Sequence, residues 1–306
     1  MKKSILITGA SGMLGIHLKK YFPDAICPTR HDYDLTNPIH VESMLSTYAP
    51  NIVIHAAAKV GGMLANLQYP LDFFEENILI NTLVLKYANK YNVSRFIGIL
   101  STCIYPDISK VYPMKEIDLF SGPPAPSNFS YGYAKRCLAV QIDACNIQYG
   151  TKYNYVIPSN LYSENDRIHD DKKTHFITAL LKKIKLAEKL GKKEIIVFGD
   201  GTPLRQFMYA DDLAKIIKIM VTNDITDSFN IAPENQNYSI SDMVNMTLKV
   251  LGKDDWNVIY DTDKPNGQYR KDVSIDIMKL HIKNFEFTKF EDGIKKTYAF
   301  LKQMEE

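Results

Sequence analysis

The chain has 306 residues, 45% of them hydrophobic and 24% charged. This is the composition of a globular protein of about two domains, and it excludes disorder as the main state. The 37 basic and 35 acidic residues leave a formal net charge of +2, which gives no electrostatic footprint for a nucleic acid or an anionic membrane. The apolar run near the start is too short for a signal peptide, and no stretch offers the roughly 20 apolar residues of a membrane-spanning helix.

Cysteine usage is typical of a reducing compartment. The cysteines show neither CxxC spacing nor a zinc-binding pattern, and they stand at Cys27, Cys103, Cys137 and Cys145. Such a pattern is expected for free thiols in a cytoplasmic protein. We therefore predict a cytoplasmic location and no metal site.

Short apolar runs rich in Ile and Val alternate with longer segments of helical periodicity. Their apolarity is continuous rather than alternating, which indicates a parallel sheet covered by helices on both faces. The predicted strands are residues 4–8, 25–29, 52–57, 96–100, 153–158 and 194–198. The predicted helices between them are residues 12–21, 39–47, 71–91 and 131–149. This alternation predicts an α/β fold with a doubly wound parallel sheet of the Rossmann type.

The pattern changes after Asn160, where a polar stretch leads into further helical segments. These predicted helices are residues 176–190, 211–221, 240–251 and 290–304. We predict a dinucleotide-binding Rossmann domain of residues 1–160, to which residues 194–220 return, with the strand 194–198 joining the main sheet. Residues 161–193 and 221–306 are predicted to form a smaller, C-terminal substrate domain.

A glycine-rich turn of GxxGxxG spacing directly follows the first predicted strand and opens the first predicted helix. Gly9 permits the tight turn, Gly12 lets a pyrophosphate approach the backbone, and Gly15 lets the helix pack closely on the sheet. The free N–H groups of the helix N-terminus then face the anion. In that context the turn predicts a dinucleotide site that includes Ser11 and Met13.

The residues after the second predicted strand bear on the choice between NAD and NADP. An NAD enzyme places an acid there for the ribose hydroxyls, whereas this chain has Arg30, which could pair with a 2′-phosphate. We therefore expect NADP(H). Asp32 lies two residues further on, and an ordinary surface cation is the alternative interpretation of Arg30.

Tyr131 and Lys135 form a Tyr-x-x-x-Lys motif at a predicted helix start. Four residues apart, the phenol and the ammonium share one helix face, and a nearby cation is expected to lower the pKa of the tyrosine so that it can exchange a proton with a carbonyl oxygen. Ser101 ends a predicted strand at its carboxyl end, where α/β sheets place ligands, and can hydrogen-bond the same oxygen.

Several blocks of the chain resemble the extended short-chain dehydrogenase/reductases, and among them the GDP-L-fucose synthase subgroup. The resemblance covers nearly the whole chain, and the blocks AAKVGG and STCIYP are specific to that subgroup. The matching blocks are residues 56–62, 101–106, 158–162, 201–207, 211–212, 266–267 and 270–271. The resemblance implies a homodimer in which residues 71–91 and 131–149 pair into a four-helix bundle.

The reaction that the resemblance implies has two parts and uses NADPH on a GDP-4-keto-6-deoxy sugar. Carbons 3 and 5 are epimerised, and the 4-ketone is then reduced. Ser101, Tyr131 and Lys135 match the family's reductive triad, and Cys103 and His175 match the pair that moves protons during epimerisation. The alternatives from the residues themselves are a small core residue for Cys103 and a helix-capping surface histidine for His175.

The remaining candidate residues are also implied by the resemblance. Further cofactor contacts are Ala57, Lys135, Pro158, Asn160 and Leu161, and substrate contacts are Asn160, Val197, Phe198, Arg205 and Lys271. Arg205 and Lys271 match residues near the GDP phosphates, and Val197 and Phe198 match the pair beside the base, where the family usually has Trp in place of Phe198. Ser163 and the loop 166–173 depart from the family pattern beside the expected substrate.

Competing functions remain open at this point. The leading function would serve a surface polysaccharide such as capsule or lipopolysaccharide, with a hexose or a heptose as the sugar. One alternative is a C-4 reductase that works after a separate epimerase, on a hexose or a heptose. An NAD-retaining nucleotide-sugar 4-epimerase or 4,6-dehydratase is another, and Arg30 argues against it. A non-catalytic dinucleotide sensor is a third, but such proteins typically lose the tyrosine or the lysine that this chain keeps.

Overall fold

The computed structural model describes residues 3–166 and 174–304. The loop 166–173, which departs from the family pattern, therefore lies outside the described residues except for Asp166. Within the described part of the chain, no helix has the length and apolarity that crossing a bilayer requires.

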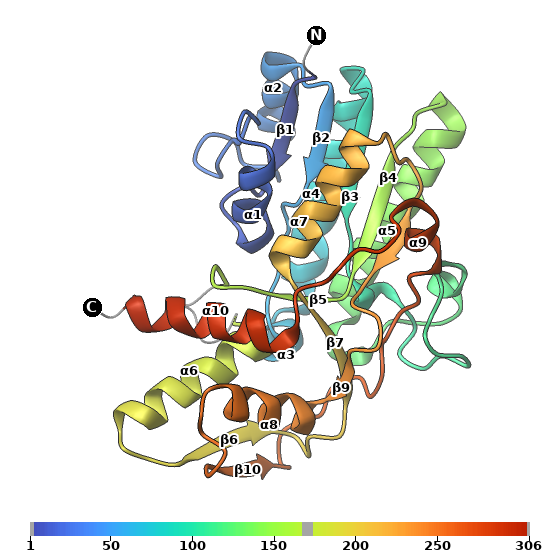
Figure 1. The fold of residues 1–306 in the computed structure, drawn as a ribbon. Coiled ribbons are helices and arrows are strands. Elements are labelled where there is room, and N and C mark those ends of the chain that lie inside the picture. The colour runs from blue at the N-terminus through green and yellow to red at the C-terminus, as the bar shows by residue number, and fades with distance from the viewer. Residues whose placement is uncertain (1–2, 167–173, 305–306) are drawn as a thin grey trace.

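The main sheet is parallel and runs in the order β1, β2, β3, β4, β8 (Figure 1). Its strands are β1 Ile5–Thr8, β2 Ile52–His55, β3 Arg95–Ile99, β4 Asn154–Pro158 and β8 Phe229–Ile231. Because all of these strands run the same way, their carboxyl ends lie along one edge of the sheet. The prediction of a doubly wound α/β fold is confirmed.

The predicted strand 25–29 is reduced to a single bridge. Ile26 pairs with Leu6 on the side of β1 away from β2. Pro28 has no N–H with which to extend the ladder. The chain thus visits one side of β1 before it crosses to β2 on the other, which places a topological switch point, the usual ligand position, at the end of β1.

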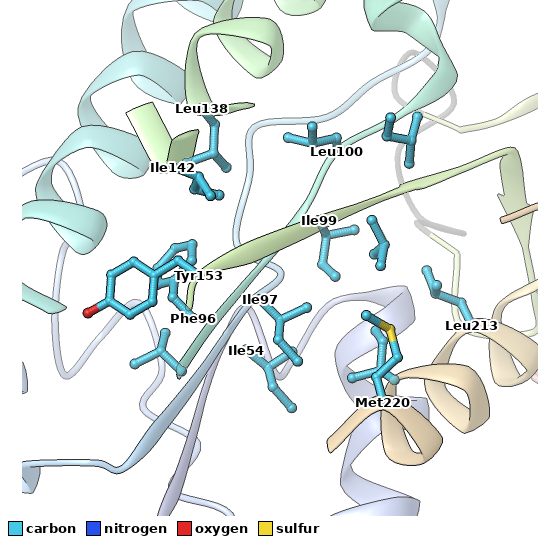
Figure 2. Packing of buried hydrophobic residues seen from close by; sticks show 14 of the residues in the cluster. Ile54, Phe96, Ile97, Ile99, Leu100, Leu138, Ile142, Tyr153, Leu213 and Met220 are labelled. Carbon is cyan, nitrogen blue, oxygen red and sulfur yellow. The ribbon is translucent and has the colours of Figure 1, made fainter. Parts of the chain in front are cut away.

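Helices cover both faces of the sheet, as continuous apolarity predicts. The pair α1 (Met13–Tyr21) and α7 (Ala210–Thr222) packs on one face, and α4 (Pro70–Lys90) and α5 (Phe129–Tyr149) pack on the other. Figure 2 shows the side chains of α5 and of α7 on opposite sides of the strand residues Ile54, Ile97 and Ile99. The other helices around this core are α2 Pro38–Tyr48, α3 Met63–Gln68, α9 Asp276–His281, and the 3-10 turns η1 Thr102–Ile104, η2 Glu116–Phe120 and η3 Pro126–Asn128.

The strand β6 (Glu194–Phe198) does not return to the main sheet, so that prediction is wrong. It pairs in parallel with β10 (Asn257–Asp261) in a separate sheet. Its residues alternate between exposed and buried: Ile196 is 49% exposed and Val197 is 3% exposed. A strand with one solvated face cannot lie inside a sheet covered on both faces. A third sheet joins β5 Asn160–Tyr162, β7 Leu204–Tyr209 and β9 Asn237–Ser239.

A second hydrophobic core lies among these smaller sheets and three helices. The helices are α6 Phe176–Lys189, α8 Ile240–Val250 and α10 Phe290–Gln303. The assignment of the whole range 221–306 to this region needs correction, because β8 lies in the main sheet and Met278 of α9 belongs to the first core. With three residues, FNI, β8 is too short to give a periodic signal in the sequence.

Candidate active site

The glycine turn has the close packing that its sequence predicts. Gly9 has a positive φ of 71°, and a Cβ there would lie 2.7 Å from Cα of Ala57. A Cβ on Gly15 would lie 2.2 Å from the carbonyl oxygen of Gly9. Gly12 occupies the N-cap position of α1, and because it has no side chain, the N–H groups of the first turn are left for a bound anion. The turn therefore fits a dinucleotide pyrophosphate.

A buried hydrogen-bond chain connects this turn to α4 and α5. Thr8 Oγ1 lies 2.8 Å from His55 Nδ1, and His55 Nε2 lies 3.1 Å from Asn81 Oδ1. Burial and the nearby Lys135 lower the pKa of His55 to about 3, so the imidazole is neutral. Because the amide oxygen of Asn81 only accepts, Nε2 carries the proton and Nδ1 accepts from Thr8.

Thr8 and Asn81 complete this chain at its two ends. The Ala57 N–H donates to Thr8 Oγ1 at 3.2 Å, and Asn81 Nδ2 donates to the carbonyl of Ala134 at 3.4 Å. The turn is thereby linked to the residue before Lys135. Sequence reasoning missed Asn81, although Asn77 and Asn81 at helical spacing in an otherwise apolar stripe are the available signal.

Local hydrogen bonds engage Asp32 but leave the neighbouring Arg30 exposed. Thr29 donates its N–H and its hydroxyl to one carboxylate oxygen of Asp32, at 2.8 and 2.7 Å, and these bonds lower the pKa of Asp32. Asp32 is thus engaged in a turn, whereas the Arg30 side chain is exposed beside it. This arrangement favours the interpretation of Arg30 as a ligand for a 2′-phosphate.

Ser101 and Cys103 lie just beyond the carboxyl end of β3. Ser101 is the N-cap of η1, and its hydroxyl accepts from the N–H of Cys103 at 3.3 Å. Helix α5 approaches this turn closely, since a Cβ on Gly132 would lie 2.7 Å from the carbonyl oxygen of Cys103. Cys103 and Tyr131 consequently share one small apolar cluster with Ala65, Phe73 and Val60.

Tyr131 and Lys135 occupy a buried face of α5. Lys135 Nζ donates to the carbonyl of Ile99 at 2.9 Å, and burial lowers the pKa of Lys135 to about 8. The expectation that Lys135 lowers the pKa of Tyr131 is wrong here, because burial and the neighbouring Cys103 raise it. Tyr131 therefore keeps its proton at neutral pH and can donate it to an oxygen.

His175 is anchored by a residue that sequence reasoning missed. It is the N-cap residue of α6, and its Nδ1 lies 2.9 Å from Asp166 Oδ1. Its backbone N–H donates to the other carboxylate oxygen of Asp166 at 3.2 Å. The Asp166 side chain is 2% exposed and that of His175 is 30% exposed, so a buried anion holds a reachable imidazole. A contact between two residues nine positions apart leaves no periodic signal in the sequence.

Lys271 lies beside the thiol of Cys103, 3.6 Å from Nζ to Sγ. Burial is the largest single effect on the pKa of Cys103 and raises it, and the Lys271 ammonium is the largest of the effects that lower it. A hydrogen bond with Ser101 and the Arg205 guanidinium act in the same direction as Lys271, and the net pKa is lowered. Burial lowers the pKa of Arg205 to about 10, so this side chain stays cationic at neutral pH.

The remaining predicted substrate residues lie in the part of the molecule that surrounds the second hydrophobic core, called here the second region. Val197 is buried in the second core, so only its backbone could face a ligand. Phe198 is 43% exposed, and Lys183 Nζ lies 4.3 Å from its ring centroid. Asn160 donates from Nδ2 to the carbonyl of Gln206 at 3.2 Å.

The other predicted cofactor residues lie near the carboxyl edge of the sheet. Pro158 ends β4, and Asn160 and Leu161 begin β5. The structure thus gathers the glycine turn, Ala57, Ser101, Cys103 and the α5 residues along one edge, with Arg205 and Lys271 reaching it from the second region.

Comparisons with known proteins agree with this geometry. A model of the NAD dependent epimerase/dehydratase family matches residues 5–232. The chain is 35% identical to a GDP-L-fucose synthase of Dictyostelium discoideum, over 97% of this chain and 94% of the relative. It superposes with a TM-score of 0.86 and 28% identity on a GDP-L-fucose synthetase from Naegleria fowleri bound to NADP, covering 100% and 96% of the two chains.

A second solved structure bears on the type of sugar. The chain superposes with a TM-score of 0.84 and 25% identity on a GDP-mannoheptose C4 reductase from Campylobacter jejuni with NADP bound, covering 99% of each chain. The family model, the curated relative and these structures all span most of the chain. The chain therefore belongs to the NAD dependent epimerase/dehydratase family and, within it, to the GDP-L-fucose synthase subgroup of the extended short-chain dehydrogenase/reductases.

Proposed function

We propose that this protein reduces the 4-ketone of a GDP-4-keto-6-deoxy sugar with NADPH after inverting carbons 3 and 5. The observation that carries the proposal is the cluster that Tyr131 and Cys103 share beside Ser101. A protonated phenol and a thiol of lowered pKa lie side by side there. One ketone held at this point could receive a proton on its oxygen and lose a proton from an adjacent carbon.

NADPH is the cofactor that the site fits best, and it supplies the hydride that reduces the ketone. The turn of Gly9, Gly12 and Gly15 would hold its pyrophosphate. Arg30 would hold the 2′-phosphate because Asp32 is engaged with Thr29. Further contacts are expected from Ser11, Met13, Ala57, Lys135, Pro158, Asn160 and Leu161.

Reduction depends on Ser101 and on Tyr131 and Lys135 of the buried face of α5. Tyr131 donates its proton to the ketone oxygen, and Ser101 hydrogen-bonds the same oxygen. Lys135 holds its ammonium against the Ile99 carbonyl at the foot of this site. The triad thereby provides positive character where negative charge develops on the substrate oxygen.

Epimerisation depends on Cys103 and His175. Protons on carbons adjacent to a ketone are acidic, so a thiolate can remove one while Ser101 and Tyr131 stabilise the enolate oxygen. An imidazole on the opposite face returns a proton and inverts the centre. The contact between His175 Nδ1 and the buried Asp166 carboxylate holds the imidazole in place for this return.

The GDP part would lie in the region of the second hydrophobic core, with Arg205 near the phosphates and Val197 and Phe198 beside the base. Asn160 would be a further substrate contact. A hexose is favoured over a heptose because identity is 35% to the fucose synthase but 25% to the heptose reductase. A 4-epimerase or 4,6-dehydratase that keeps NAD remains the second candidate, and exposed Arg30 disfavours it. A GDP-6-deoxy sugar for a surface polysaccharide and a cytoplasmic location stay predictions from the sequence.

We also propose that the protein is a homodimer formed through α4 and α5. These neighbouring helices expose large apolar side chains, Leu71 at 63%, Leu79 at 44%, Val140 at 50% and Ile147 at 87%. Such a surface fits pairing of the two helices with their copies as a four-helix bundle. Light scattering should show a dimer, and Val140→Glu should shift it toward a monomer. A monomeric wild-type protein would contradict this proposal.

The test of the activity is turnover in deuterated water. The protein is incubated with NADPH and GDP-4-keto-6-deoxymannose, and the product is examined by proton NMR. Reduction with deuterium at carbons 3 and 5 is the expected result. Reduction without that deuterium would make the protein a plain C-4 reductase, and co-purification with stoichiometric NAD would support the second candidate instead.

A further inference from the structure

Lys271 stands on a loop that the second region holds tightly against the first. Gln268 donates from Nε2 to the carbonyls of Pro106 and Asp107, at 3.0 and 3.1 Å. Arg270 forms a paired contact with Asp272, at 2.6 and 3.0 Å. These contacts lie on both sides of Lys271, so the position of its ammonium is set by the fold and not by a free surface side chain.

Further bonds fix the segment that follows. The Val273 N–H donates to Gln206 Oε1 at 3.0 Å, and Met114 exchanges backbone hydrogen bonds with Asp272 and Ser274, at 2.9 and 2.8 Å. The Lys271 ammonium therefore meets the thiol of Cys103, 168 residues away in the sequence, in a prearranged pair.

The surroundings of the thiol contain cations and neutral groups. Besides Lys271, the Arg205 guanidinium acts on Cys103, and both are positive. Ser101 offers a hydroxyl, and the phenol of Tyr131 is protonated at neutral pH because its pKa is raised. The apolar neighbours Phe73, Ala65 and Val60 restrict water around the sulfur, which strengthens its interaction with a nearby charge.

We propose that Lys271 is a positioning residue for epimerisation, whose ammonium holds Cys103 as a thiolate before the substrate arrives. The family resemblance placed Lys271 near the GDP phosphates, whereas in the structure its ammonium contacts the sulfur of Cys103. The catalytic meaning of this inference rests on the proposed function, but the ionisation of the thiol does not. It can therefore be tested without any substrate.

The proton and electron balance of the step is simple. The thiolate takes the proton from the carbon next to the ketone and becomes a thiol, and the electron pair of the C–H bond moves into the enolate. His175 then delivers a proton to the carbon. The thiol must lose its proton again before the next cycle, and Lys271 remains an ammonium ion throughout.

The first experiment measures the ionisation of Cys103 directly. The other cysteines are replaced in the variant Cys27→Ser, Cys137→Ser, Cys145→Ser, and the rate of alkylation by iodoacetamide is followed against pH without nucleotide. Iodoacetamide is neutral, so loss of a lysine does not change its local concentration. Lys271→Met is expected to raise the midpoint by at least about one pH unit and to slow alkylation at pH 7 about tenfold.

Two variants serve as controls. Lys271→Arg keeps the cation and should retain a low midpoint, and Lys264→Met removes an exposed lysine of the same loop and should change nothing. NADPH binding by Lys271→Met verifies that it is folded. If Lys271→Met still binds NADPH but leaves the midpoint of Cys103 alkylation unchanged, the inference is wrong, and Lys271 would instead be a contact of the GDP phosphates.

The second experiment separates the two possible roles during turnover. In Lys271→Met, deuterium incorporation at carbons 3 and 5 should fall at pH 7 and recover near pH 9, where the thiol ionises unaided. Loss of phosphate binding would instead raise KM at both pH values. A shifted midpoint without exchange by the wild-type protein would support the thiolate pair and reject the proposed function, so the two failures are distinguishable.

Discussion

The residues proposed for reduction and those proposed for epimerisation are held in place by different parts of the molecule. Tyr131 and Lys135 belong to one regular helix, and Lys135 is bonded to a backbone carbonyl of the main sheet. Cys103 and His175 instead meet charged partners from loops, Lys271 and Asp166. The residues proposed for reduction are therefore positioned by the first core, whereas the positions of those proposed for epimerisation depend on the conformation of loops. A change in a loop could remove one activity and leave the other.

Tyr131→Phe should have the largest effect, because it removes the proton donor of the reductive group. We expect NADPH oxidation with the keto sugar to fall about a thousandfold, within the range for loss of a general acid. Phenylalanine keeps the aromatic ring of tyrosine and lacks only the hydroxyl, so packing should be preserved. NADPH binding should therefore be unchanged. Reduction that survives in this variant would contradict the role of Tyr131.

Asp166→Asn should damage only the epimerisation pair. The imidazole of His175 loses the buried carboxylate that holds its ring in place, and deuterium incorporation should fall about tenfold to a hundredfold. Reduction of a substrate that is already epimerised should continue at the wild-type rate. Glu164→Gln, a neighbouring carboxylate bonded to Tyr209, is the matched control. An equal loss in both reactions would mean that the two sets of residues are not independent.

Much of this arrangement follows from the sequence, and the exceptions share a physical cause. The glycine turn and the helix carrying Tyr131 are recognisable because periodicity and local backbone needs are written into neighbouring residues. The parallel sheet follows from continuous apolar runs. The prediction that strand β6 joins the main sheet is wrong because the sequence does not reveal what packs against a strand, and this decides whether one face or both faces are buried.

The charged partners could not be predicted for a different reason. Lys271 contacts Cys103 at a separation of 168 positions, and Asp166 contacts His175 at a separation of nine. Such pairs depend on where loops lie in space, and any of the 35 acidic or 37 basic residues could have served. The roles of the candidate site residues remain predictions that the variants above would test.

Gly15→Ala and Gly12→Ala separate folding from cofactor binding within the first core. A Cβ at Gly15 would overlap the backbone of Gly9 and Ala10, at 2.2 and 2.5 Å, whereas one at Gly12 would lie 3.3 Å from its nearest neighbour. Gly15→Ala should lower the free energy of unfolding by about 1–3 kcal/mol. Gly12→Ala should keep most of that stability but weaken NADPH binding, as titration would show. Equal stability in both variants would argue against the packing role of Gly15.

Lys135 and Lys271 allow a finer comparison of the two sets of residues. Lys271 faces a thiol that can become an anion, whereas Lys135 is bonded to a neutral carbonyl and its pKa is lowered to about 8 by burial. In the unfolded chain a lysine has a pKa of about 10.4, so between these values the unfolded state binds more protons and the free energy of unfolding rises with pH.

Urea denaturation of the wild-type protein and of Lys135→Met, at pH 8 and pH 9, isolates this contribution from every other group that titrates in the same range. The difference in free energy of unfolding should move in favour of the wild type by about 1 kcal/mol between the two pH values. Below about pH 7, one unit under the pKa of the folded state, both states carry the ammonium and the difference should be constant. A constant difference up to pH 9 would mean that Lys135 keeps its charge in the folded state, and this site would then hold a permanent cation.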